Sequence, residues 1–327
     1  MPPSRQLGPL PILAIWAAFC FGSALYATRT GYGGRSLAAT LITFSFYFAV
    51  MLFFAARRVP DLIAGRFGRG SGYVLCAAAV VAYFTYAVGT STASWQRSAA
   101  VLGFVLVPLA LAATAERQPP GAWQDFLILA GIWVGVKFSP SHWLWPYPGG
   151  HLAYVLTVLL CLNVALATFV LIRKVNGIGY SIGWGSRWGF YVLASFIVFG
   201  AIAIPLATGM HFIQFAPRWQ AWQTWPITLI TIFFFTAWPE EFLFRGLLQN
   251  LLGRATRSEF RGWWMASILF GFSHITNLGF PNWRYVLLAS IAGIFYGWTW
   301  RKSGSIFASA IVHALVDATW HFFFRTM

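Results

Sequence analysis

The chain has 327 residues, of which 59% are hydrophobic and only 9% carry a charge. Soluble globular proteins contain about 25% charged residues, so this composition excludes a soluble enzyme, and its apolar content excludes a disordered chain. The net charge of +15 does not indicate nucleic-acid binding, because the 22 basic residues lie mostly in short gaps between apolar runs. We therefore predict an all-α, polytopic transmembrane helical bundle with no nucleic-acid partner.

Apolar runs along the chain predict the spanning helices. A bilayer core about 30 Å thick requires roughly 20 apolar residues per span. About eleven spans are predicted, with an error of about two: Leu10–Thr28, Leu37–Ala56, Tyr73–Thr90, Ala99–Ala115, Trp123–Phe138, Leu152–Ile172, Trp188–Ala207, Trp225–Leu252, Trp263–Ile275, Trp283–Trp300 and Ser305–Phe324. The polar, aromatic stretch His211–Gln223 divides them into N-terminal helices of unknown role, residues 1–215, and a four-helix C-terminal unit, residues 216–327.

The basic residues in the loops predict the orientation. One side of the predicted bundle carries fourteen of them: Arg5, Arg57, Arg58, Arg66, Arg69, Arg117, Arg173, Lys174, Arg187, Arg254, Arg257, Arg261, Arg301 and Lys302. The other side carries seven: Arg29, Arg35, Arg97, Lys137, Arg218, Arg284 and Arg325. The positive-inside rule places the first side, and with it the N-terminus, in the cytoplasm.

Ionisable side chains inside the apolar helices of the C-terminal unit predict a functional site. Carboxylates at membrane depth cost a few kcal/mol each and are by default functional. Glu240, His274, His313 and Asp317 each lie eleven to fifteen residues from the nearest inner basic residue. With a helical rise of about 1.5 Å per residue, all four lie roughly 16–23 Å from the inner rim, so residues from three helices converge on one layer. Glu241 and Arg245 are spaced i, i+4 and can form an ion pair.

Three short motifs carry a resemblance. Residues 240–245 contain EExxxR, residues 270–274 read FxxxH, and residues 313–317 read HxxxD. In this order, within a hydrophobic C-terminal unit, they resemble the CAAX protease and bacteriocin-processing (CPBP, or ABI) family of glutamic intramembrane endopeptidases. The resemblance covers about residues 220–327 and does not extend to the preceding helices.

The chemistry of these residue types suits peptide hydrolysis. Cleavage of a peptide bond requires an activated water, a proton carrier and a stabiliser for the tetrahedral oxyanion. We expect Glu240 to act as the general base, His274 to share the water, and His313 with Asp317 to face the oxyanion. The resemblance implies the same roles, with Glu241 and Arg245 in support. Asp317 departs from the Asn that many family members carry at this position, and a carboxylate cannot donate a hydrogen bond unless protonated.

Three alternatives remain open at this point. No cofactor is expected, but Glu240, His274, His313 and Asp317 also form a plausible nitrogen and oxygen ligand set for a divalent metal in a metalloprotease. A proton-coupled transporter could use the same buried carboxylates. A noncatalytic scaffold could retain these groups as structural ion pairs and helix caps. The chain lacks HExxH, GxGD and GxSG motifs, which argues against other classes of membrane protease.

The expected substrate is a membrane protein or a lipid-anchored peptide within the bilayer. The resemblance allows prenylated C-terminal tails, or sorting and leader segments of exported proteins. We favour processing of an exported, membrane-tethered protein in the bacterial inner (plasma) membrane, because the loops are compact. Cys20, Cys76 and Cys161 lie outside the C-terminal unit, so simple hydrolysis is expected rather than transfer through an acyl-cysteine.

Overall fold

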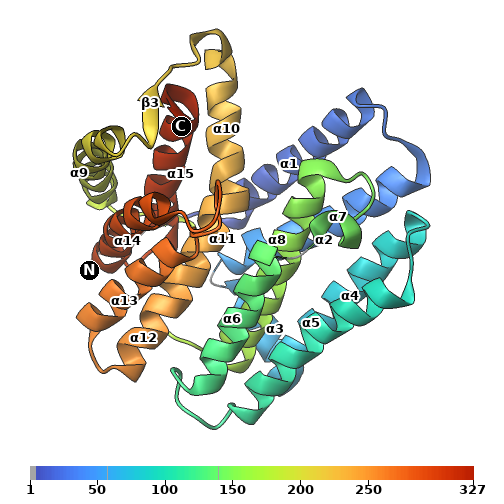
Figure 1. Ribbon diagram of the computed structural model, residues 1–327. Coiled ribbons are helices and arrows are strands. Elements are labelled where there is room, and N and C mark those ends of the chain that lie inside the picture. Colours follow the sequence, from blue (N-terminus) through green and yellow to red (C-terminus); the bar gives the residue numbers. More distant parts are fainter. Residues whose placement is uncertain (1–4, 57, 139) are drawn as a thin grey trace. The chain divides into compact units, whose positions relative to one another are not determined.

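The computed structural model describes residues 5–56, 58–138 and 140–327, and it is built almost entirely of helices (Figure 1). Among these residues, eight helical segments are long and apolar enough to cross a membrane, which confirms an all-α, polytopic membrane protein. Three further predicted spans coincide with α6 (Trp123–Phe138), α13 (Glu259–Phe272) and α14 (Trp283–Ser303). The first two have only 16 and 14 residues, so the number of spans stays a prediction. Arg57, used in the orientation argument, lies outside the described residues.

The chain forms two compact units, and the first comprises Gln6–Asn176. After the short strand β1 (Arg5–Gln6), its elements are α1 (Pro9–Arg29), α2 (Gly34–Phe54), α3 (Arg58–Phe67), η1 (Gly68–Gly70), α4 (Ser71–Gly89), α5 (Trp95–Thr114), α6, α7 (Ser141–Leu144), α8 (Gly150–Ala165) and the π-helical η2 (Leu166–Ile172). Most residues of the stretch Gly150–Ile172 are buried, because α2, α4 and α6 pack around it. This central helix forms the core of the unit.

A buried ion pair holds the loop between α5 and α6, which is predicted to lie on the cytoplasmic side. Asp125 lies in the first turn of α6, as predicted, and it accepts two hydrogen bonds from Arg173, at 2.6 Å from Nε and 2.9 Å from Nη2. The remaining N–H groups of Arg173 donate to the carbonyls of Ala115, Gln118 and Pro119. One guanidinium thus satisfies the loop carbonyls that follow α5, which explains how Asp125 is tolerated in an apolar helix.

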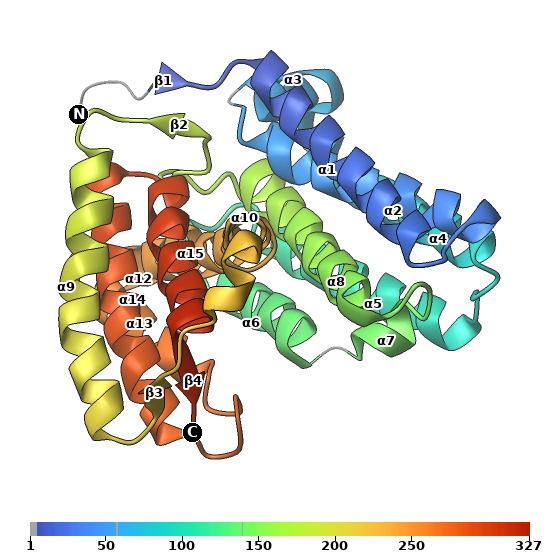
Figure 2. The ribbon, with the colours of Figure 1, turned by 90° about the horizontal axis from the view of Figure 1, so that it is seen from above.

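The second unit contains Gly177–Met327. Its elements are β2 (Gly183–Trp184), α9 (Trp188–Gly209), β3 (Ile213–Phe215), η3 (Trp219–Thr224), α10 (Trp225–Ile232), η4 (Phe233–Ala237), α11 (Trp238–Glu241), η5 (Phe242–Gln249), α12 (Asn250–Ala255), α13, α14, α15 (Ile306–Phe323) and β4 (Phe324–Thr326). Helices α9, α14 and α15 lie side by side, and the antiparallel pair β3–β4 crosses their ends, with Ile213 opposite Thr326 (Figure 2).

The predicted span Trp225–Leu252 is one continuous helical stretch that contains two π-helical segments. The backbone is π-helical in η4 and η5, on either side of the α-helical turn that carries Pro239, Glu240 and Glu241. Proline cannot donate the usual helical hydrogen bond, and π-turns inside helices often accompany functional sites. Beside Pro239 the helix therefore departs from regular α-helical winding in a pair of wide turns, which flank the two glutamates.

The division between units differs from the predicted boundary at residues 215 and 216. Helix α9 belongs to the second unit because it packs on α14 and α15. Ser195 on α9 shares a 2.6 Å hydrogen bond with Thr299 on α14, and Phe199 contacts Phe295 and Tyr296 edge-on or tilted. The boundary between a catalytic region and helices of unknown role remains a prediction.

Candidate active site

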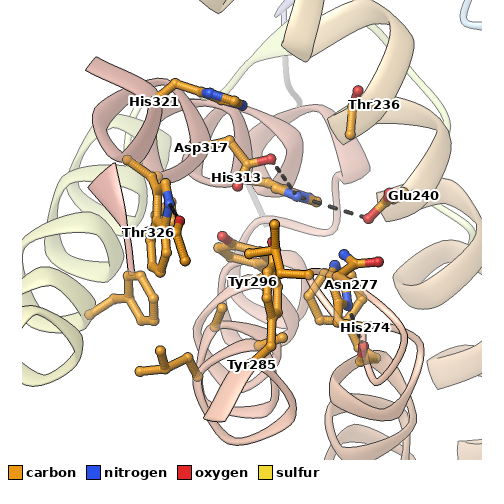
Figure 3. Close-up of a pocket in the computed structure, with 18 of the residues that line it drawn as sticks. Thr236, Glu240, His274, Asn277, Tyr285, Tyr296, His313, Asp317, His321 and Thr326 are labelled. Atoms are coloured by element: carbon orange, nitrogen blue, oxygen red, sulfur yellow. Dashed lines mark hydrogen bonds and ion pairs between the residues drawn. The ribbon is translucent and has the colours of Figure 1, made fainter. Parts of the chain in front are cut away.

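A cavity of about 470 Å³ within the second unit collects the predicted site residues. Glu240 reaches it from α11, His274 from the turn after α13, and His313 and Asp317 from α15 (Figure 3). The prediction that these four side chains face one cavity is confirmed.

Glu241 lies behind the cavity and is completely buried. Its Oε1 lies 3.0 Å from Nη1 of Arg245, which confirms the predicted ion pair. The same oxygen lies 2.9 Å from Nδ1 of His313, and Oε2 lies 2.5 Å from the hydroxyl of Ser309. Glu241 therefore joins its own helix to α15 at two points, in addition to holding Arg245.

The Arg245 guanidinium is enclosed by aromatic rings. Its central carbon lies 4.3 Å from the ring centre of Phe270 and 5.2 Å from that of Tyr296. Cation–π contacts of this kind are worth about 2 kcal/mol when the cation is desolvated. With Glu241 as counter-ion, these rings make a buried cation tolerable at membrane depth.

His313 lies between three carboxylates. Its Nδ1 faces Glu241, while its Nε2 lies 3.4 Å from Oδ2 of Asp317 and 4.0 Å from Oε2 of Glu240. The ring is stacked on Tyr296, with centroids 4.7 Å apart. Both ring nitrogens therefore face carboxylate oxygens, which can accept hydrogen bonds from the ring.

His274 is held in one orientation by the end of α13. Its Nδ1 lies 2.8 Å from the carbonyl oxygen of Phe270, and a ring nitrogen can only donate to a carbonyl. In the neutral ring the lone pair is therefore on Nε2. The ring also stacks on Tyr285, with centroids 5.1 Å apart and planes inclined by 14°.

The helix that carries the FxxxH motif ends earlier than predicted. We expected a span from Trp263 to Ile275, but α13 ends at Phe272 and His274 lies in the following turn. The reason is local, because the side chains of both Ser273 and His274 donate hydrogen bonds to the Phe270 carbonyl. These two side chains therefore cap the end of the helix. His274 is thus a cap and a cavity residue at once.

The cavity also contains polar residues that sequence reasoning missed. They are Thr236, Asn277, Tyr285, Tyr296, His321 and Thr326. His321 follows His313 and Asp317 at spacings of eight and four on the same helix face, a signal that could have identified it. No motif distinguishes the tyrosines or Asn277.

The described residues contain no group of three or more His, Cys, Asp or Glu side chains arranged to hold a metal ion. Within the predicted ligand set, Nδ1 of both histidines is engaged, by Glu241 in His313 and by the Phe270 carbonyl in His274.

Comparison with known proteins identifies the segment that carries the site. Residues 221–319 match the family described as "Type II CAAX prenyl endopeptidase Rce1-like", and they include Glu240, His274, His313 and Asp317. This confirms the resemblance to the CPBP family over about a third of the chain and indicates a membrane endopeptidase of the CAAX type. No curated protein and no solved structure matches the chain.

Proposed function

We propose that the protein is a glutamic-type intramembrane endopeptidase that hydrolyses a peptide bond near the membrane-embedded end of a protein substrate. The observation that carries this proposal is the shared cavity: Glu240, an oriented His274 and the His313–Asp317 pair face one space inside apolar helices. A base, a second acceptor for the water and a positive charge near the developing oxyanion are groups that promote peptide hydrolysis.

Each group has a definite part in the proposed reaction. Glu240 accepts a proton from a water that also donates to Nε2 of His274, and the water oxygen bonds to the scissile carbonyl carbon. The carbonyl electron pair moves to oxygen, where the His313 imidazolium provides positive charge. As the carbon–nitrogen bond breaks, Glu240 returns its proton to the leaving amine, so no metal or covalent intermediate is required.

A hydrophobic groove beside the cavity supports a substrate that arrives from the lipid. This groove of about 620 Å³ lies between α9 and α15 and is lined almost entirely by apolar side chains. It shares Phe199, Leu288, Val316 and Trp320 with the cavity. An apolar segment lying in the groove would therefore present its end to Glu240 and His274.

The cavity lies toward the end of its unit opposite to the basic residues, which supports an exported substrate. Its outer lining comes from Asn277 after α13, Tyr285 in the first turn of α14, and Trp320 and Thr326 near the end of α15. The opposite helix ends carry the predicted cytoplasmic residues Arg254, Arg257, Arg261, Arg301 and Lys302. With the N-terminus in the cytoplasm of a bacterial cell, the cavity faces the exterior.

The experiment compares membrane proteins of a deletion strain complemented with wild type, Glu240→Gln or Glu259→Gln. Glu259 is the matched control, a surface carboxylate near Arg301 whose side chain is 87% exposed. We expect one class of uncleaved precursor in the deletion and Glu240→Gln strains, and complete processing with Glu259→Gln. An identical protein profile in all strains would contradict a protease. If Glu240→Gln instead abolished only a pH-dependent transport flux across the membrane, the transporter alternative would be favoured.

A further inference from the structure

The proposed reaction needs hydrogen-bond donors at the position of the oxyanion, and Asp317 does not supply one. Its Oδ2 lies 3.4 Å from Nε2 of His313, so in this pair the carboxylate accepts and the ring donates. One donor of His313 is used in this contact, and the other faces Glu241. Oxyanion sites are generally built from two or more preorganised donors.

Asn277 is a neutral donor placed in the same cavity. It lies three residues after His274, in the turn between α13 and α14, and is half-buried. Figure 3 shows its amide beside His274, on the side of the cavity where Glu240 lies. A carboxamide carries two N–H donors in every protonation state of its neighbours, unlike the carboxylates and histidines around it.

The turn that carries Asn277 is held in place by three contacts. The Asn282 side chain donates to the backbone carbonyl of Asn277 at 3.0 Å and accepts from the backbone N–H of Tyr285 at 3.1 Å. The Asn277 side chain hydrogen-bonds with that of Tyr285, whose ring stacks on His274. One tyrosine therefore orients both Asn277 and His274, which is the preorganisation that electrostatic stabilisation of a transition state requires.

We propose that Asn277 is a catalytic residue whose side-chain N–H donates a hydrogen bond to the oxyanion, and that Tyr285 is its positioning residue. This inference rests on the proposed peptidase function. As the water oxygen bonds to the carbonyl carbon, the electron pair displaced onto oxygen is stabilised by the second amide hydrogen of Asn277. No bond to Asn277 forms or breaks, and the electron pair returns when the amine leaves.

The test measures kcat and KM of purified protein in vesicles with two quenched fluorescent probes. One is a farnesylated peptide ending in a CAAX sequence, and the other is an apolar transmembrane peptide. We expect Asn277→Ala to lower kcat by roughly 10²-fold with little change in KM. Asn277→Asp, which keeps the shape but loses the donor, should lose at least as much. Asn250→Ala, which removes a surface contact with Arg254, serves as the matched control.

A rescue variant separates this role from a structural one. Asp317→Asn adds an amide to the same cavity, so in the Asn277→Ala background it should recover at least about tenfold of the lost kcat. If Asn277→Ala acted only by lowering the melting temperature, an added amide at position 317 would not recover kcat. If a folded Asn277→Asp protein keeps the wild-type kcat, or if the loss is confined to KM, the inference is overturned while the protease remains. If wild type cleaves neither probe, the proposed function fails and this inference fails with it.

Discussion

Adjacent glutamates in α11 have different surroundings because a helix turns by about 100° per residue. Glu240 lines the cavity, whereas Glu241 is buried behind it among Arg245, His313 and Ser309. The pair EE therefore supplies a reactive carboxylate and, directly next to it, the carboxylate that fixes the histidine of α15. The different roles of these two neighbouring residues follow from helical geometry.

The first prediction concerns the buried partner. Glu241→Ala leaves the Arg245 guanidinium, which is 1% exposed, without its counter-ion. Removing one member of a buried ion pair costs about 3–5 kcal/mol of unfolding free energy. Denaturant unfolding in micelles should show this loss, and Glu259→Ala, on the surface, should show none. Equal stability of the two variants would mean that the aromatic rings alone hold Arg245.

A second prediction at this scale concerns metal. Because glutamate-based activation of water needs no metal, we expect activity to survive chelators and the purified protein to lack stoichiometric zinc. Elemental analysis together with an assay before and after chelation provides the measurement. Metal bound between His274 and His313, with activity restored only when the metal is added back, would establish the metalloprotease alternative.

At the scale of elements, close approach of helix backbones places His274. A Cβ added at Gly271 on α13 would lie 1.9 Å from the hydroxyl oxygen of Ser290 and 2.5 Å from the backbone carbonyl of Val286, both on α14. Small residues at such crossings allow membrane helices to pack closely. His274 lies three residues beyond this crossing, so the packing of α13 against α14 determines where the histidine enters the cavity.

Gly271→Ala should therefore separate α13 from α14. We expect a lower melting temperature and a loss of activity larger than the loss of folded protein explains, because His274 is displaced. Gly103→Ala on α5 is the control, since an added Cβ there meets no atom within 4 Å. Thermal unfolding in micelles and specific activity per folded molecule give the measurement, and unchanged activity in a destabilised Gly271→Ala protein would show that His274 does not depend on this crossing.

At the scale of the whole molecule, the distribution of basic residues predicts which membrane face the cavity opens to. In a variant lacking Cys20, Cys76 and Cys161, we introduce Leu278→Cys beside the cavity or Ala255→Cys at the basic end. Both positions are exposed. A membrane-impermeant maleimide should label Leu278→Cys in spheroplasts and Ala255→Cys only after lysis. The reverse pattern would place the cavity in the cytoplasm and remove the argument for an exported substrate.

Much of the protein's fold could be predicted from its sequence, because the lipid environment directly constrains the composition of a spanning chain and the length of its apolar runs. The integral membrane character, the positions of the helices and the residues of the three motifs all follow from local patterns. The depth of each ionisable residue is a matter of counting along a helix of known rise, and so the common cavity was also predictable.

The tertiary structure alone decided how these residues act on one another. Glu241 and His313 are separated by 72 positions in the chain, and no local pattern predicts that they lie 2.9 Å apart. The early end of α13, the tautomer of His274 and the presence of Asn277 and Tyr285 in the cavity depend on side chains that compete for one carbonyl or stack across helices. Such contacts arise from the packing of helices, and a single sequence specifies them only through the folded chain.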